Sequence, residues 1–306
     1  MNEFYLVHIT VFEQTAILGL LALSFQIVLR SGVFSFASVG FYALGAYGAA
    51  DLAKVSMPMW GALAIVVVVS GAIGYALFYP FVRLHGLYLG MVTFAFVEII
   101  GVAANNGGTL TGGPVGLFGV PYTIPVAFLF VILAAAALLV SQLERRSLGR
   151  SLLVLKSDEQ LARTLGNNVN SQRAFIFAFS ASLGALAGAL NTVTTSTVST
   201  SGFGFALIVT GLTMAVVGGV GSWSGALIGA VIIAWFPQVF AFVGAYSEVV
   251  YGVLVILVVA FEPGGIIMLL GRLIKSLRKL IGGSSRSLGR GGASGPVNIE
   301  AGGSVG

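Results

Sequence analysis

The sequence has no cysteine and few charged residues, and both absences limit what the protein can be. None of its 306 residues is cysteine and only 8% are charged, whereas about a quarter of a typical soluble domain is charged. Without cysteine there can be no disulfide framework and no Cys-ligated metal or iron–sulfur site. With 57% hydrophobic residues and a mean hydropathy of +1.02, the chain is predicted to be a membrane protein.

Sequence motifs for catalysis are missing as well. No glycine is followed directly by lysine, so the chain cannot contain the phosphate-binding loop G-x4-G-K-[ST] of an ATPase. No HExxH, GxSxG or strand-associated GxGxxG motif is present, which leaves protease, hydrolase and dinucleotide-binding functions without support. We therefore expect no enzyme activity, catalytic residue, metal site or cofactor in this chain. The first residues, MNEFYLVHIT, lack a basic segment and predict no cleaved signal peptide.

What the chain has instead is a series of long apolar segments. A helix of about 20 apolar residues crosses the roughly 30 Å of bilayer hydrocarbon. The chain is therefore predicted to be all-α, a polytopic transmembrane helix bundle of about 8–10 spans. The sequence leaves open whether residues 203–243 form two full spans or one span with re-entrant pieces. The nine predicted spans are residues 9–29, 33–53, 58–81, 86–104, 121–143, 173–194, 203–220, 224–243 and 247–263.

Basic residues gather on one side of this predicted topology. If the N-terminus is outside, every one of the 15 basic residues except Lys54 falls on the cytoplasmic side. Cytoplasmic loops carry such an excess, so we predict an external N-terminus and a cytoplasmic C-terminus. The net charge of +5 is then explained by the basic residues on the cytoplasmic side, and no nucleic-acid partner is expected. Residues 1–281 are predicted to be the membrane domain. The Gly/Ser-rich residues 282–306 are predicted to be a disordered cytoplasmic tail.

One predicted cytoplasmic loop, residues 144–172, contains the signature of a short capped helix. Ser157 and Gln160 form an S-x-x-Q capping box. Acidic residues follow in the first turn and Arg163 stands near the end, which complements the helix dipole. About eight helical residues are too few for stability alone in water. The helix must therefore dock against its own membrane helices or a separate protein, unless this is an ordinary connector.

Polar groups near the predicted outer ends of the spans form a candidate solute path. Glu98 lies among apolar residues inside a predicted span, where a charge costs several kcal/mol. Amides, hydroxyls and glycines follow it, and such groups suit weak binding of a neutral or zwitterionic solute. The alternatives are a helix-register contact for Glu98 and a simple turn for the others. The candidate path consists of Glu98, Asn105, Asn106, Thr109, Thr111, Gly112 and Gly113.

Glycines spaced four residues apart predict close helix packing, because small residues let helix backbones approach each other. This pattern is found at Gly86 and Gly90 and in two further sets. The predicted packing glycines of those two sets are Gly184 and Gly188, and Gly221, Gly225 and Gly229.

Six segments, taken in order, resemble a known family. They are Ser31–Tyr47 (SGVFSFASVGFYALGAY), Gly86–Ile100 (GLYLGMVTFAFVEII), Leu110–Pro121 (LTGGPVGLFGVP), Gly149–Asn168 (GRSLLVLKSDEQLARTLGNN), Val216–Ile228 (VVGGVGSWSGALI) and Phe261–Ile266 (FEPGGI). This ordered set resembles the permeases of branched-chain amino acid ABC importers, specifically their M-type subunit. The resemblance covers roughly residues 20–270.

The resemblance implies a set of partners and a role for the 144–172 loop. The implied partners are a second permease subunit, two ATP-binding cassette subunits that bind ATP and Mg²⁺, an extracytoplasmic solute-binding protein and the lipid of a prokaryotic inner membrane. In this family the loop contains a coupling helix that sits in a cleft of the ATPase. At Ser157 and Leu153 the sequence departs from the family pattern. The implied ATPase-coupling residues are Gly149, Arg150, Lys156, Ser157, Asp158, Glu159, Leu161, Ala162, Leu165 and Gly166.

The sequence is therefore compatible with three classes of function. The leading hypothesis is the pore-forming permease of an ATP-driven importer for branched-chain amino acids, working by alternating access, with urea or another small amide as an alternative solute. The second is an ion-coupled secondary transporter in which Glu98 relays a proton or cation. The third is a membrane scaffold or enzyme without transport activity, which the missing catalytic motifs disfavour.

Overall fold

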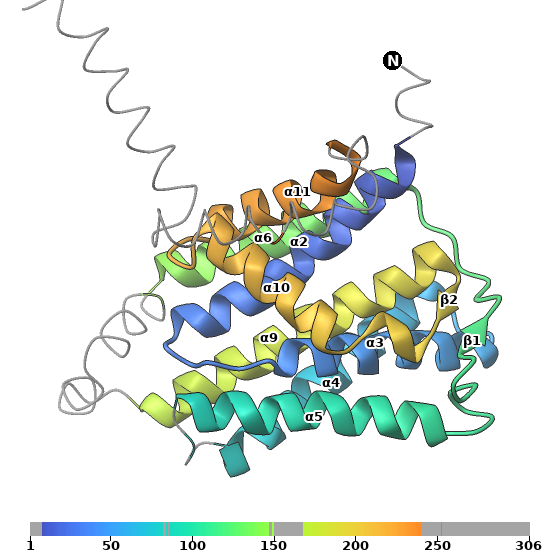
Figure 1. Cartoon of the computed structure of the whole chain (residues 1–306), viewed down its shortest axis with the longest axis horizontal. Helices are drawn as coiled ribbons and strands as arrows, with labels where there is room; N and C mark the ends of the chain where they lie inside the picture. The colour runs from blue at the N-terminus through green and yellow to red at the C-terminus, as the bar shows by residue number, and fades with distance from the viewer. Residues whose placement is uncertain are drawn as a thin grey trace, which may run out of the picture. The chain divides into compact units, whose positions relative to one another are not determined.

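The chain folds as a bundle of α-helices (Figure 1). The computed structural model describes residues 8–81, 84, 86–146, 149, 168–239 and 252. Within these residues the only strands are a two-residue antiparallel pair, and one 3₁₀ turn is also present, so the predicted all-α class is confirmed. The elements are α2 (Ile9–Arg30), α3 (Ala37–Lys54), α4 (Met59–Phe81), α5 (Leu87–Asn106), β1 (Leu117–Phe118), α6 (Val126–Arg145), α9 (Val169–Thr195), β2 (Thr197–Val198), η1 (Thr200–Gly202), α10 (Phe205–Gly218) and α11 (Trp223–Val239).

Within the described residues, six helical segments are long and apolar enough to cross a membrane, which makes this a multi-pass membrane protein. They are α2, α4, α5, α6, α9 and the continuous stretch Thr200–Gly218. Residues 203–239 form two helices, α10 and α11. The predicted span 247–263 and the tail 282–306 lie outside the described residues, apart from residue 252.

One predicted span begins later than the sequence suggested. We predicted a span from residue 121, but α6 begins at Val126. The reason is local, because Pro125 holds an extended backbone at the N-cap. Proline also disfavours helical geometry in the residue before it, and Pro121 and Pro125 act on the same segment.

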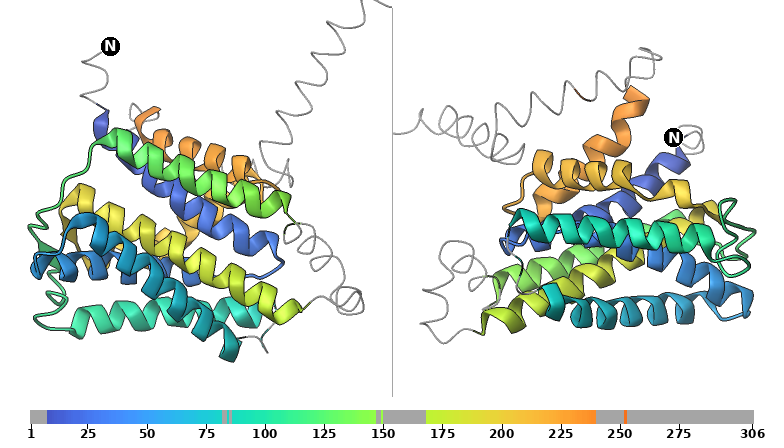
Figure 2. Two further views of the ribbon diagram at one scale, coloured as in Figure 1. Left: turned by 180° about the vertical axis from the view of Figure 1, so that it is seen from behind. Right: turned by 60° about the horizontal axis from the view of Figure 1, so that its bottom comes forward.

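Helix α9 is the centre of the bundle. It packs against α2, α3 and α4, while α10 and α11 pack against each other and α2 (Figures 1 and 2). Both α2 and α9 are mostly buried, whereas α4, α5 and α6 leave most of their surface exposed. Helix α5 packs mainly on α3 and lies at the lower margin of the bundle in Figure 1.

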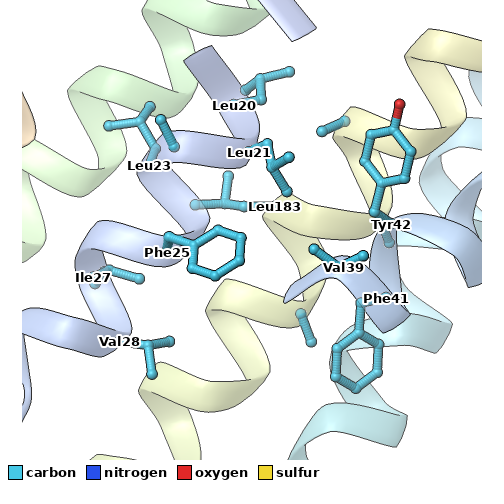
Figure 3. Close-up of a cluster of buried hydrophobic side chains, with 14 of the residues drawn as sticks. Leu20, Leu21, Leu23, Phe25, Ile27, Val28, Val39, Phe41, Tyr42 and Leu183 are labelled. Atoms are coloured by element: carbon cyan, nitrogen blue, oxygen red, sulfur yellow. The ribbon is translucent and has the colours of Figure 1, made fainter. Parts of the chain in front are cut away.

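The core is built where α2, α3 and α9 meet (Figure 3). Leu21 and Phe25 of α2, Phe41 of α3 and Leu183 of α9 are at most 5% exposed. Inside this core the Ser24 hydroxyl donates to the Ser180 carbonyl oxygen at 2.9 Å, and the Ser38 and Ser180 hydroxyls lie 3.1 Å apart. These bonds satisfy polar groups that would otherwise be costly to bury.

Helices α3 and α9 run parallel with their backbones in close contact. A Cβ at Gly184 would lie 2.6 Å from the Ser38 carbonyl oxygen, and one at Gly188 would collide with the Tyr42 carbonyl oxygen. The first turn of α3 is thus level with the middle of α9, about 23 Å from the start of α9 at 1.5 Å per residue. The predicted span 33–53 corresponds to α3, which begins four residues later, inside the bundle, and is not among the six segments long and apolar enough to cross a membrane.

The glycine set near residue 225 differs from its prediction at one position. Gly225 and Gly229 face the backbone of α10, at Gly218 and Met214. Gly221 was predicted to share their helix face, but it lies in the turn before α11, and a Cβ there would meet nothing within 4 Å. Helix α11 begins after Ser222, whose hydroxyl accepts from the Gly225 N–H at 3.3 Å.

The segment before α6 is held to the α3–α4 turn by one hydrogen bond, which gives a first prediction. The Tyr122 hydroxyl donates to the Met57 carbonyl oxygen at 2.6 Å, and burial raises the pKa of this hydroxyl, so it stays protonated and donating. Replacing Tyr122 by Phe is expected to lower the free energy of unfolding by about 1 kcal/mol. Thermal unfolding in detergent measures this. Tyr88→Phe, at a side chain that is 73% exposed, should change little.

Candidate functional site

Three polar side chains meet at the end of the bundle where the 144–172 loop begins. Arg30, the last residue of α2, places its Nη1 2.8 Å from the Glu144 Oε2 of α6. The Gln26 Nε2, one turn earlier in α2, donates to the Glu144 Oε1 at 2.9 Å. Arg30 Nη1 also donates to the Gly221 carbonyl oxygen at 2.7 Å. Gln26 Nε2 also donates to the Val220 carbonyl oxygen, at 3.3 Å. We call Gln26, Arg30, Glu144 and Gly221 the inner-end junction.

The inner-end junction is largely withdrawn from solvent. Gln26 is fully buried, and the side chains of Arg30 and Glu144 are only 13% and 11% exposed. Two further polar atoms, Arg30 Nε and Gln26 Oε1, are buried and have no hydrogen-bond partner among the residues that the structure describes. Opposite charges attract more strongly at low dielectric, but each also loses its hydration there. The junction therefore depends on both charges being present, and it ties α2, α6 and the α10–α11 turn together.

The junction stands at the root of the predicted coupling loop. Glu144 and Arg145 end α6, and the Gly149 N–H donates to the Arg146 carbonyl oxygen at 3.1 Å. A Cβ at Gly149 would collide with the Glu144 carbonyl oxygen, so only glycine fits there. At the other root, the Asn168 side chain caps α9 by accepting from the Ser171 N–H at 3.2 Å. The other predicted coupling residues, Arg150 to Gly166, lie outside the described residues.

The junction was not predicted from the sequence. Arg30 was used only to predict the orientation of the helices, and no role was predicted for Gln26 or Glu144. The signal present in the sequence was that Gln26 interrupts an apolar helix one turn before Arg30. Its partner, however, is 118 residues away along the chain, and only the packing of α2 on α6 brings the two together.

Glu98 lies on an exposed face of α5, as the twelfth of the helix's 20 residues. Phe94, Glu98, Val102 and Asn106 follow one another every four residues and lie along a shallow, open surface hollow of about 660 Å³, whose described lining comes from α5 alone. Glu98 makes no hydrogen bond or ion pair to any residue within the part of the chain that the structure describes. The alternative role for Glu98, a helix-register contact inside this chain, therefore has no partner group among those residues.

The remaining predicted path residues form a tight outer turn rather than a common surface with Glu98. The Thr111 hydroxyl donates to the Ala104 carbonyl oxygen at 2.5 Å, and the Lys54 ammonium donates to that of Leu110 at 2.8 Å. Gly112 and Gly113 have φ angles of +74° and +60°, which favour glycine. Asn105 and Thr109 are exposed, so of the predicted set only Glu98 and Asn106 share the α5 hollow.

Replacement of Glu98 is expected to affect transport without affecting folding. Because Glu98 contacts no other described side chain through a polar bond, Glu98→Gln and Glu98→Leu should leave the thermal unfolding midpoint nearly unchanged. If the hollow is part of a solute path, loss of one charge-assisted hydrogen bond should reduce uptake about tenfold or more. Solute uptake by reconstituted protein tests this. Leu87→Gln, at an exposed position of the same helix, is the control and should retain uptake.

Different polar contacts lie at the two ends of the bundle. The ends of α2 and α6 and the α10–α11 turn meet at one end, while Lys54, the Thr109–Leu110 turn and the β1–β2 pair meet at the other. Successive helices thus alternate in direction, as a polytopic bundle requires. The fold and its polar ends define an α-helical, multi-pass membrane protein.

Comparison with known proteins gives the family. The model of the family described as "Branched-chain amino acid transport system / permease component" matches residues 8–259. The chain is 30% identical over 289 residues to the high-affinity branched-chain amino acid transport system permease protein LivM of Salmonella typhimurium, covering 83% of this chain and 68% of that protein. It is 29% identical to LivM of Escherichia coli over the same shares. The chain belongs to this family of ABC transport permeases.

A third relative matches a shorter part. The permease protein BraD of Pseudomonas aeruginosa is 32% identical over 142 residues, covering 45% of this chain and 44% of that protein. No solved structure matches the chain.

Proposed function

We propose that this chain is a permease subunit of an ATP-driven importer for branched-chain amino acids. It acts in a prokaryotic inner membrane with a second permease, two ATPase subunits that bind ATP and Mg²⁺, and an extracytoplasmic solute-binding protein. The observation that carries the proposal is the family match over residues 8–259, nearly the whole membrane part. The relatives' names supply the solute class.

On the cytoplasmic side, the inner-end junction suits the transmission of movement from the ATPase. The proposed coupling helix, residues 157–166, connects to the bundle through the loop that leaves α6 at Glu144 and enters α9 at Asn168. A push on this loop reaches α2 and the α10–α11 turn at once, because Arg30 binds both Glu144 and Gly221. Rigid-body rocking of packed helices then switches access from outside to inside.

In the middle of the membrane, the α5 face supports a solute path between two permease subunits. A carboxylate facing lipid at this depth costs several kcal/mol, so water or protein must cover it. Glu98 has no partner within the described part of its own chain, and apolar residues such as Phe94 and Ile99 surround it. A path formed with the second permease would hydrate the carboxylate and leave the apolar residues to contact an aliphatic solute.

The proposal is tested with the assembled complex. The chain is co-expressed with candidate ATPase and second permease subunits, purified, and assayed for ATP hydrolysis with and without the binding protein. We expect the binding protein to stimulate hydrolysis. Glu159→Arg and Leu161→Asp should remove the stimulation, by uncoupling or by dissociating the ATPase.

Two outcomes would count against the proposal. Full stimulation after deletion of residues 157–166 would exclude the coupling role of this helix. A chain that purifies without any ATPase, yet transports solute, would exclude the importer assembly as a whole. Val68→Ala, at a side chain of α4 that is 70% exposed, serves as the control and should leave stimulation unchanged.

A further inference from the structure

A second hollow lies at the opposite end of the bundle from the inner-end junction. It has a volume of about 120 Å³ and lies where α3, α9 and the β2–η1 segment meet. Tyr42 and Ala46 of α3 and Asn191 of α9 contribute to its wall, and Val198 and Phe203 contribute from the segment that follows α9. In the predicted orientation this hollow opens toward the outside. It is separate from the α5 hollow that contains Glu98.

Two polar groups in the wall have unused hydrogen-bonding capacity. Tyr42 is 6% exposed, and its hydroxyl makes no hydrogen bond with any residue that the structure describes. Figure 3 shows its ring directed away from Phe41, with the hydroxyl at the far end. The side-chain amide of Asn191 likewise has no partner among the described residues. Asn191 is half-buried, and both groups line the hollow, so they can form hydrogen bonds with water or a ligand there.

The neighbouring hydroxyls hold the wall in shape. The Thr192 hydroxyl donates to the Ala46 carbonyl oxygen at 3.2 Å, which joins α9 to α3. The Thr195 hydroxyl lies 2.7 Å from the Asn191 carbonyl oxygen and 3.0 Å from that of Thr197. The Ser199 and Ser201 hydroxyls lie 2.9 Å apart. The hollow is therefore a formed site whose backbone is fixed on both sides.

The chemistry of the wall selects the class of ligand. Among the residues that the structure describes, none that lines the hollow is charged, so these groups offer a ligand with a net charge no compensation for its lost hydration. Amide and hydroxyl groups can bind the ammonium and carboxylate of a zwitterion, while Val198 and Phe203 offer apolar contact to an aliphatic side chain. A dry cavity of about 150 Å³ holds one benzene molecule, so a hollow of similar size admits one small molecule.

We propose that this hollow is an outer subsite that binds a small aliphatic amino acid before it enters the path between the permeases. The subsite rests on the proposed import function. Binding by neutral groups alone is weak, and weak binding suits a site that must release its solute onward. Tyr42 and Asn191 are the polar contacts, and Val198 and Phe203 contact the side chain.

The absence of cysteine from the chain makes the test direct. The variants Thr197→Cys and Ser199→Cys, both at residues that line the hollow, are each assembled into the complex, reconstituted, and labelled from outside with a charged thiosulfonate reagent. Leucine is expected to slow labelling about threefold at twice its dissociation constant, by simple competition. The matched control is Ser56→Cys, at an exposed residue of the same end outside the hollow, where leucine should have no effect.

Uptake measured in the same vesicles separates the two proposals. Asn191→Ala and Tyr42→Phe should raise the KM for leucine severalfold. If the vesicles take up leucine but leucine slows labelling at neither cysteine, the subsite is overturned and the import function still stands. Equal slowing at Ser56→Cys would also overturn it, because the effect would then not be local. Failure of the unmodified complex to take up leucine would contradict the proposed function instead.

Discussion

Reversing the charge of Glu144 is expected to uncouple the transporter. In Glu144→Arg, two cations would face each other where Arg30 and Glu144 now lie 2.8 Å apart with little exposure. Loss of one partner from a buried ion pair costs about 3–5 kcal/mol, because the remaining charge is left without compensation. The ends of α2 and α6 should separate, and ATP hydrolysis should no longer drive uptake. The ratio of uptake to ATP hydrolysis measures this coupling.

The exchange variant shows whether the effect belongs to the pair. Arg30→Glu combined with Glu144→Arg restores opposite charges and should recover part of the uptake, although the bonds to Gln26 and Gly221 are not reproduced. The control is Asp51→Asn, which removes one charge of the exposed ion pair with Lys54 at 2.7 Å and should have little effect, since exposed pairs contribute about 0–1 kcal/mol. Normal coupling in Glu144→Arg would show that the junction transmits nothing.

Replacing Gly188 by valine is expected to prevent stable folding. A Cβ at this position would collide with the Tyr42 carbonyl oxygen, and a change of rotamer cannot relieve a collision with backbone. Helices α3 and α9 would have to separate, opening the core around Phe41 and Leu183. We expect a loss of about 3 kcal/mol or more, at the upper end of overpacking costs. The yield of monodisperse protein and its thermal unfolding midpoint measure this.

A second glycine provides the matched control. Gly101 lies in α5, and a Cβ there would meet nothing within 4 Å. Gly101→Ala should be neutral or stabilising by up to about 1 kcal/mol, because alanine is the better helix former. A similar loss of folded protein in both variants would contradict the explanation from backbone contact and point to a general intolerance of substitution.

The sequence predicts which residues form helices, but it does not predict where in the bundle each helix begins. Runs of apolar residues predicted α2, α4, α5 and α9 to within a few residues, because a membrane span must be apolar along its whole length. The start of α3 inside the bundle was not predictable in this way. Its position follows from contacts of Ser38 and Tyr42 with glycines of α9, which local hydropathy does not encode.

The candidate sites were predicted unevenly for a similar reason. Glu98 could be singled out because one carboxylate in an apolar span is conspicuous in a sequence. The pair of Arg30 and Glu144 could not, since each residue stands at a predicted membrane boundary where charges are ordinary. The hollow beside Tyr42 depends on hydroxyls and an amide from two distant segments, and a threonine-rich stretch alone does not reveal which helix faces it.

The most direct test of the account is leucine uptake into vesicles that contain the complete complex and trapped ATP. We predict accumulation that requires ATP and the binding protein, and that persists when proton and sodium gradients are collapsed. The Gly188→Val and Glu144→Arg variants should not accumulate leucine under these conditions. Uptake by this chain without any ATPase, driven by an ion gradient and abolished in Glu98→Gln, would contradict the account and establish an ion-coupled transporter instead.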